Sequence, residues 1–122
     1  MSELDNALAH IHNTLPYTPH WIAVITVDGK NMGYFGVERA DEDRVTAMLA
    51  ASEALNSRIS NELNNGKFRY GVVGAEKGIS LIMALGEVGI LGINFDQILS
   101  FDRLFQTLPQ AIAPLLAFLN LK

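Results

Sequence analysis

Residues 41–64 constrain the fold of this chain most, because they predict one long helix with two different apolar sides. Bulky apolar residues recur at helical spacing in one sector, which is typical of a face buried in the core. These residues are Val45, Met48, Leu49, Leu55, Ile59 and Leu63. The roughly opposite sector carries Ala47, Ala50, Ala51 and Ala54, with Arg58 as its charged residue. This smooth side favours the close approach of another helix, but alanine is also the best helix former, which would explain it without a partner.

The composition predicts a single domain that associates with another chain. The 122 residues are enough for one compact domain and too few for two. Hydrophobic residues make up 49% of the chain and charged residues 18%, so we expect association to cover part of the surface. The net charge is −4 and the basic residues are scattered. We therefore expect neither nucleic acid nor an anionic membrane surface as a partner.

The absence of cysteine excludes a disulfide framework, a thiolate metal site and a cysteine nucleophile. It also fits a reducing compartment. Residues 1–5, which include Glu3 and Asp5, lack the apolar run of a secretory signal. Residues 104–121 are uncharged, but they contain two prolines and fall short of the roughly 20 apolar residues that a membrane-spanning helix needs. We expect a cytoplasmic protein without membrane insertion.

The expected elements follow in the order helix, two-strand hairpin, long helix, three-strand meander and helix. Ser2 caps the first helix, and Asp28-Gly29 between two apolar runs is a strong hairpin signal. Asp41 caps the long helix, which ends at the left-handed stop Asn64-Asn65-Gly66. The expected strands are residues 21–27, 32–37, 68–73, 79–85 and 90–95. Three of these strands are nearly continuous in apolar residues, which predicts that both faces of the sheet are covered.

The side chains of strand 68–73 are expected to alternate between an apolar side and a side with two basic residues. The apolar side consists of Phe68, Tyr70 and Val72, and the other side of Lys67, Arg69 and Gly71. One polar face of this kind is typical of an edge strand.

Two prolines disturb the last helical region, which begins at Phe101 after a capping Ser100. Pro109 predicts a break or kink near Leu108, because proline lacks the N–H that a continuous helix needs. Thr107 and Gln110 have the spacing of a capping box for a second helical segment.

The order of elements resembles the roadblock, or dynein-light-chain-like, family, including its bacterial and archaeal single-domain members. Residues 22–29, the alanine-rich helix from Asp41 and residues 76–86 carry the resemblance, which covers roughly residues 2–95. It implies an α+β fold in which a five-stranded antiparallel sheet has the order 2-1-5-4-3. The long helix would cover one face, and the N- and C-terminal helices the other. We expect residues 1–122 to form one such domain, with an atypical proline-containing tail from about residue 97.

The resemblance also implies a homodimer in which third strands pair across a two-fold axis and long helices pack side by side. Such a dimer would cover the third-strand edge. The implied interface residues are Ala47, Ala50, Ala51, Ala54, Arg58, Phe68, Tyr70 and Val72. Family members of this type bind Ras-like small GTPases, so the resemblance implies a small GTPase as the second partner.

No residue pattern indicates catalysis. The segment from Gly78 to Ile82 has isoleucine where a nucleophile elbow needs its second glycine, and the acidic and histidine residues lack metal-ligand spacing. We therefore expect no enzyme activity, catalytic residue, cofactor or metal. The first hypothesis is a non-catalytic adaptor that modulates the nucleotide cycle of a GTPase. The alternatives are a small-molecule sensor, with a pocket between the tail, Trp21 and Phe35, and a structural dimerisation module.

Overall fold

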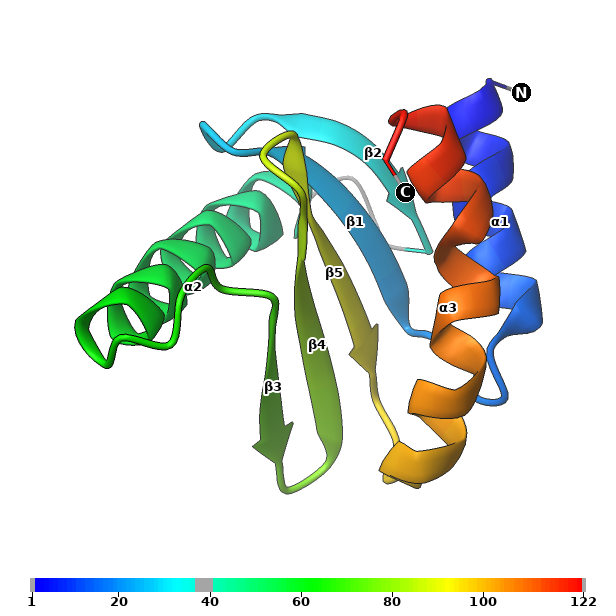
Figure 1. Cartoon of the computed structure of the whole chain (residues 1–122). Coiled ribbons are helices and arrows are strands. Elements are labelled where there is room, and N and C mark those ends of the chain that lie inside the picture. The colour runs from blue at the N-terminus through cyan, green and yellow to red at the C-terminus, as the bar shows by residue number, and fades with distance from the viewer. Residues whose placement is uncertain (1, 37–40, 122) are drawn as a thin grey trace.

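A computed structural model of the chain describes residues 2–36 and 41–121. One antiparallel sheet has the strand order β2-β1-β5-β4-β3, with α2 on one face and α1 and α3 on the other (Figure 1). The elements in chain order are α1 (Glu3–Thr14), β1 (Trp21–Thr26), β2 (Asn31–Phe35), α2 (Glu42–Glu62), β3 (Tyr70–Ala75), β4 (Gly78–Leu85), β5 (Gly89–Phe95) and α3 (Phe101–Phe118). The predicted α+β class, strand order and layering are confirmed. Val37, the expected end of the second strand, lies outside the described residues.

The larger core lies between the sheet and the pair α1 and α3. Ser2 caps α1 as predicted, because its Oγ accepts a hydrogen bond from the Asp5 N–H at 3.1 Å. The apolar face of α1, including Leu8 and Ile11, is buried against the sheet and α3. Among the described residues, no helix combines the length and apolar character that crossing a membrane requires.

The predicted break in the C-terminal region is wrong, because α3 runs through both prolines as one helix. Thr107 does not cap a new segment, since its Oγ1 donates to the carbonyls of Arg103 and Leu104 one turn earlier. A proline inside a helix costs about 3 kcal/mol, whereas each fully buried leucine or isoleucine contributes about 1.5–3 kcal/mol. The buried stripe that spans the prolines outweighs their cost. It consists of Leu104, Leu108, Ala111, Ile112 and Leu115.

Pro114 leaves the Gln110 carbonyl without its usual donor, because residue 114 has no N–H. The Nε2 atom of His10 in α1 lies 3.4 Å from that oxygen. This side chain therefore supplies a donor from the neighbouring helix and links α1 to α3 at the irregular position.

The expected core face of α2 is mostly wrong. Val45 and Leu49 are buried, and Leu49 fits over Gly92, where a Cβ atom would lie only 2.6 Å from it. The other four members are largely exposed, namely Met48, Leu55, Ile59 and Leu63. A helix of 21 residues is about 30 Å long, but five strands span only about 19 Å across the sheet. α2 still lies over the edge strand at Asn56, which is close to Gly71 of β3, and its last turns extend past the sheet (Figure 1).

The ends of α2 differ in how well they match the prediction. Asp41 occupies the N-cap position, but its side chain accepts a hydrogen bond from the Arg44 guanidinium at 2.9 Å instead of bonding a backbone N–H. The left-handed stop is confirmed, because both Asn64 and Gly66 have positive φ.

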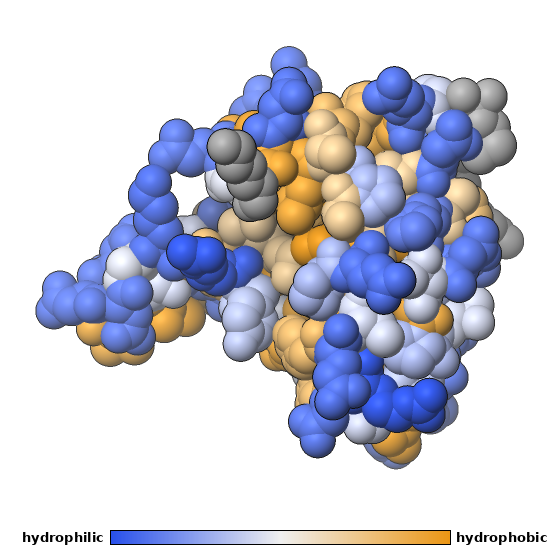
Figure 2. Space-filling model, turned by 45° about the vertical axis from the view of Figure 1, so that its right-hand side comes forward, coloured by the Kyte–Doolittle hydropathy of each residue, from blue (hydrophilic) through white to orange (hydrophobic). Residues whose placement is uncertain are grey.

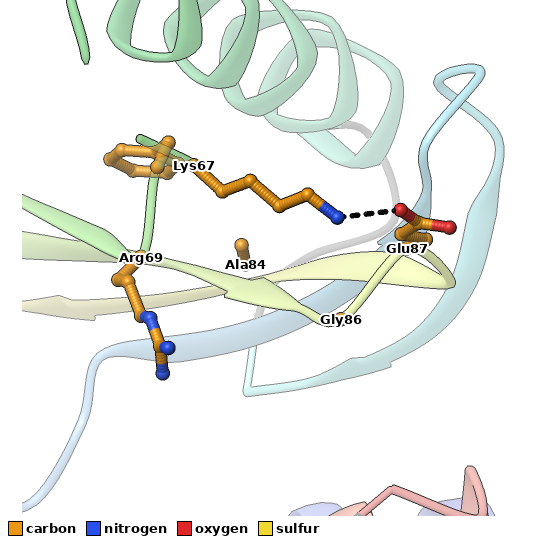
Figure 3. Close-up of a pocket in the computed structure, with 6 residues that line it drawn as sticks. Lys67, Arg69, Ala84, Gly86 and Glu87 are labelled. Carbon is orange, nitrogen blue, oxygen red and sulfur yellow. Dashed lines mark hydrogen bonds and ion pairs between the residues drawn. The ribbon is translucent and has the colours of Figure 1, made fainter. Parts of the chain in front are cut away.

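Strand β3 begins at Tyr70, two residues later than expected, and it is an edge strand as predicted. The expected alternation from residue 67 is wrong, since those first residues precede the regular strand. Phe68 packs with the core under α2, whereas Tyr70 packs against Phe105 of α3 with tilted rings whose centroids are 5.6 Å apart. Lys67 and Arg69 also lie on opposite sides (Figure 3).

Candidate functional site

The outer side of α2 carries two adjacent rows of exposed residues. The apolar row consists of Met48, Leu55 and Ile59, which are 63%, 60% and 45% exposed. The alanine row consists of Ala47, Ala51 and Ala54, which are also exposed. Figure 2 shows the C-terminal end of α2 projecting at the left, with apolar atoms along its lower side. Large exposed apolar patches on a small domain mark binding surfaces.

The free edge of β3 is the second open feature. Tyr70, Val72 and Val73 are all exposed there, and no described strand pairs with β3 on the side away from β4. Successive side chains point to opposite faces of a sheet. Tyr70 and Val72 therefore face α3, and Val73 faces α2.

One end of the apolar row, at Met48, meets β3 in a groove. Met48 and Ser52 of α2 line this groove together with Val73 of β3 and Ser80 of β4. Leu55 and Ile59 share the helical face of Met48, so the apolar row lies on the side of α2 that faces the free edge. The alanine row lies farther around the helix.

The structure places the sequence-predicted interface residues in three environments. Ala47, Ala51, Ala54 and Arg58 are exposed on α2, and Tyr70 and Val72 are exposed on β3. Ala50 instead packs partly against its own core beside Gly29, where a Cβ atom on the glycine would lie 3.6 Å from the Ala50 Cβ. Phe68 is half-buried in that same core. Sequence reasoning missed the apolar row, because its helical spacing is that of a core face.

Two exposed ion pairs flank the α2 surface. The Arg58 Nε lies 3.1 Å from Glu62 Oε1 on α2. The Lys67 Nζ, in the α2–β3 connection, lies 2.9 Å from Glu87 Oε1 in the β4–β5 turn. Figure 3 shows Lys67 and Glu87 pointing toward one another over a shallow pocket, with Arg69 directed away. The hydrogen bond and positive charge of Lys67 hold the pKa of the Glu87 carboxyl below its usual range.

Tyr34 forms the other electrostatic feature of the α2 face. Burial, together with the negative charges of Glu42 and Asp41, raises the pKa of its phenol to about 12. The phenol therefore stays neutral at physiological pH. Its hydroxyl has no hydrogen-bond partner among the described residues.

The pocket that the sensor hypothesis requires is not formed. Trp21 packs with the core on the α2 face, and Phe35 packs with the core under α1 and α3. The sheet separates the two rings, so they cannot line one cavity. Within residues 2–36 and 41–121, no three His, Asp or Glu side chains gather closely enough to hold a metal ion.

Comparison with known proteins rests on structure alone, since no family model and no curated protein matches the sequence. A Roadblock/LC7 domain from Streptomyces avermitilis superimposes with a TM-score of 0.84 and 15% identity, over 98% of this chain and 99% of its own. MglB from Myxococcus xanthus gives a TM-score of 0.85 and 12% identity, over 98% and 97%. The gliding protein MglB from Thermus thermophilus gives 0.79 and 14%, over 94% and 87%. The protein therefore has the Roadblock/LC7 fold.

Proposed function

We propose that this protein is a non-catalytic homodimeric adaptor that binds a Ras-like small GTPase and modulates its nucleotide cycle. The observation that carries the proposal is the apolar row of α2 beside the free edge of β3. An exposed row of Met48, Leu55 and Ile59 and an unpaired strand edge are each unfavourable in water, and they lie on the same side of the molecule.

A second copy of the chain would cover both the apolar row and the free edge of β3. Pairing of two β3 edges around a two-fold axis satisfies the open backbone groups of both copies. The same axis brings the two apolar rows toward each other, because each row faces its own β3 edge. Ala47, Ala51, Ala54 and Arg58 then form the outer margin of the contact. MglB, which has this fold, has been solved in a tetrameric arrangement.

The GTPase assignment rests on the resemblance to the roadblock family and on the surface that the dimer leaves open. Two α2 helices side by side would present their outer sides as one surface with few charges, which is where we place the GTPase. Arg58 and Glu62 pair with each other at the margin of this surface.

Light scattering tests the homodimer with matched substitutions on exposed apolar residues. We expect the wild-type chain of 13.4 kDa to behave as a dimer. Leu55→Glu and Ile59→Glu should weaken the dimer at least tenfold, because each forces a charge into an apolar contact. Val88→Glu, in the β4–β5 turn, is the control and should remain dimeric. A wild-type monomer contradicts the proposal.

Binding and hydrolysis assays with Ras-like GTPases from the same organism test the partner. We expect the wild-type dimer to bind one of them and to change its rate of GTP hydrolysis, and Ile59→Glu to do neither. A stable dimer that binds none of them and changes no rate indicates a structural dimerisation module instead. A small molecule retained by the purified dimer in native mass spectrometry would favour the sensor.

A further inference from the structure

Neither the backbone conformation nor the packing of the single chain requires a glycine at position 74 in β3. All ten glycines lie in the described ranges, and each of the other nine has either a positive φ or an atom close to where its Cβ would be. At Gly74 neither holds, because φ is ordinary and nothing lies within 4 Å of that position. Glycine weakens a strand, and it often marks a place where another chain approaches closely.

The hydrogen bonds of β3 limit how a second β3 can pair with it. The Ala84 N–H donates to the Arg69 carbonyl at 2.9 Å, so Arg69 and every second residue after it face β4. Tyr70, Val72 and Gly74 therefore direct their backbone N–H and C=O groups to the free edge. They must pair with the same set of residues in the partner subunit.

The faces of the sheet impose the same restriction. A two-fold axis perpendicular to the sheet keeps both α2 helices on one face, and residues directly opposite each other in antiparallel strands point to the same face. One residue of β3 must therefore lie opposite its own copy. For at least three residues of β3 to pair with their copies, this residue is Gly71, Val72, Val73 or Gly74.

We propose that Val72 lies on the two-fold axis, so that Tyr70 packs over the partner subunit's Gly74 and Val73 over the partner subunit's Gly71. This register rests on the proposed homodimer and specifies its geometry. It places each remaining exposed bulky residue opposite a glycine, once on each face of the sheet. An aromatic ring over a cross-strand glycine compensates for the missing side chain.

Each of the other three registers leaves either Tyr70 or Gly74 without a partner inside β3. With Gly71 on the axis, only residues 70–72 of the two strands overlap, and Gly74 stays unexplained. With Val73 on the axis, residues 71–75 pair, but Tyr70 lies opposite Glu76, which is beyond the end of β3. With Gly74 on the axis, only residues 73–75 pair, and Tyr70 again lies opposite a residue beyond the strand. In the proposed register residues 70–74 pair with their copies, so both Tyr70 and Gly74 have partners inside the strand. The ring of Tyr70, which already packs against Phe105, then extends the α3 side of one subunit over the other.

Cysteine cross-linking tests the register, because the chain has no cysteine of its own. Opposite residues in a hydrogen-bonded pair have Cα atoms about 5.5 Å apart, within the range of a disulfide. We expect Val72→Cys to form a disulfide-linked dimer under mild oxidation and Val73→Cys not to do so. Cross-linking through Val73→Cys alone overturns the register. If neither variant cross-links although both are dimers in light scattering, the β3 contact is wrong; a wild-type monomer refutes the homodimer itself.

Substitution of Gly74 provides a second, independent test. Gly74→Val has open space in the single chain, so its circular dichroism should match the wild type. In the dimer the new side chain meets Tyr70 of the partner subunit, and we expect at least tenfold weaker association. The double variant Tyr70→Ala with Gly74→Val should recover most of the affinity. Unchanged association of Gly74→Val, or no recovery in the double variant, contradicts the assignment.

Discussion

At the scale of single residues, the Lys67–Glu87 pair shows how little an exposed contact contributes to the fold. Both side chains are more than four-fifths exposed, although their charged atoms are 2.9 Å apart. Water and salt screen such pairs strongly. The observable consequence is therefore a change in the titration of Glu87.

The pH dependence of this pair has a definite sign. The pKa of Glu87 is lowered in the folded protein, so its contribution to stability is present above the pKa of the unfolded chain. That contribution is lost as the pH falls through the folded pKa. In an NMR titration we expect Lys67→Gln to raise the pKa of Glu87 toward its usual value. Arg69→Gln is the control, because Arg69 points away, and an equal shift in that variant would refute the assignment to Lys67 (Figure 3).

At the scale of elements, α2 and α3 show two opposite departures from sequence pattern. In α3 a buried apolar stripe holds a continuous helix through Pro109 and Pro114. In α2 an apolar spacing that is typical of a core face continues where the helix has no sheet beneath it. Packing against neighbouring elements decides both cases. Local propensity and periodicity carry no information about that packing.

Two leucines of α2 provide a matched test of which part of this helix is core. Leu49 is 5% exposed and Leu63 is 64% exposed. We expect Leu49→Ala to lower the free energy of unfolding by about 2–5 kcal/mol, because it leaves a cavity above β5. Leu63→Ala should change it by less than about 0.5 kcal/mol. Urea denaturation at low protein concentration measures both, and equal losses would contradict the position of α2.

Replacement of Pro109 tests the continuity of α3. An alanine at this exposed position restores an N–H that can donate a hydrogen bond to the Phe105 carbonyl. We therefore expect the free energy of unfolding to rise by about 1–3 kcal/mol. Pro16→Ala is the control, because Pro16 follows the end of α1 and no helix is restored there. Thermal denaturation compares the two variants. A loss of stability in Pro109→Ala would indicate that α3 is interrupted in solution.

At the scale of the whole molecule, the fold leaves one side incomplete. The sheet has helices on both faces, but β3 has a free edge and α2 keeps its apolar row exposed beside it. No segment of the described part of the chain covers this side. Folding and self-association should therefore be coupled.

Coupling of this kind makes thermal stability depend on protein concentration. A partner that binds only the folded chain raises the denaturation midpoint as its concentration rises. We expect the midpoint of the wild-type protein to increase over a hundredfold range of concentration, and that of Ile59→Glu to stay constant. Val88→Glu should behave like the wild type. A concentration-independent midpoint in the wild type would argue against a dimer in this range.

The sequence by itself determined the type and order of the elements, the cap of α1, the stop of α2 and the edge position of β3. These features depend on local chemistry, such as a serine before a helix or Asn-Gly after one, and on apolar runs that demand a sheet covered on both faces. Only the tertiary structure decided that Met48, Leu55 and Ile59 are exposed, that Trp21 and Phe35 lie on opposite faces, and that α3 is continuous. The physical reason is that burial depends on what lies opposite a side chain, and a helical repeat records which residues share a face but not what covers that face.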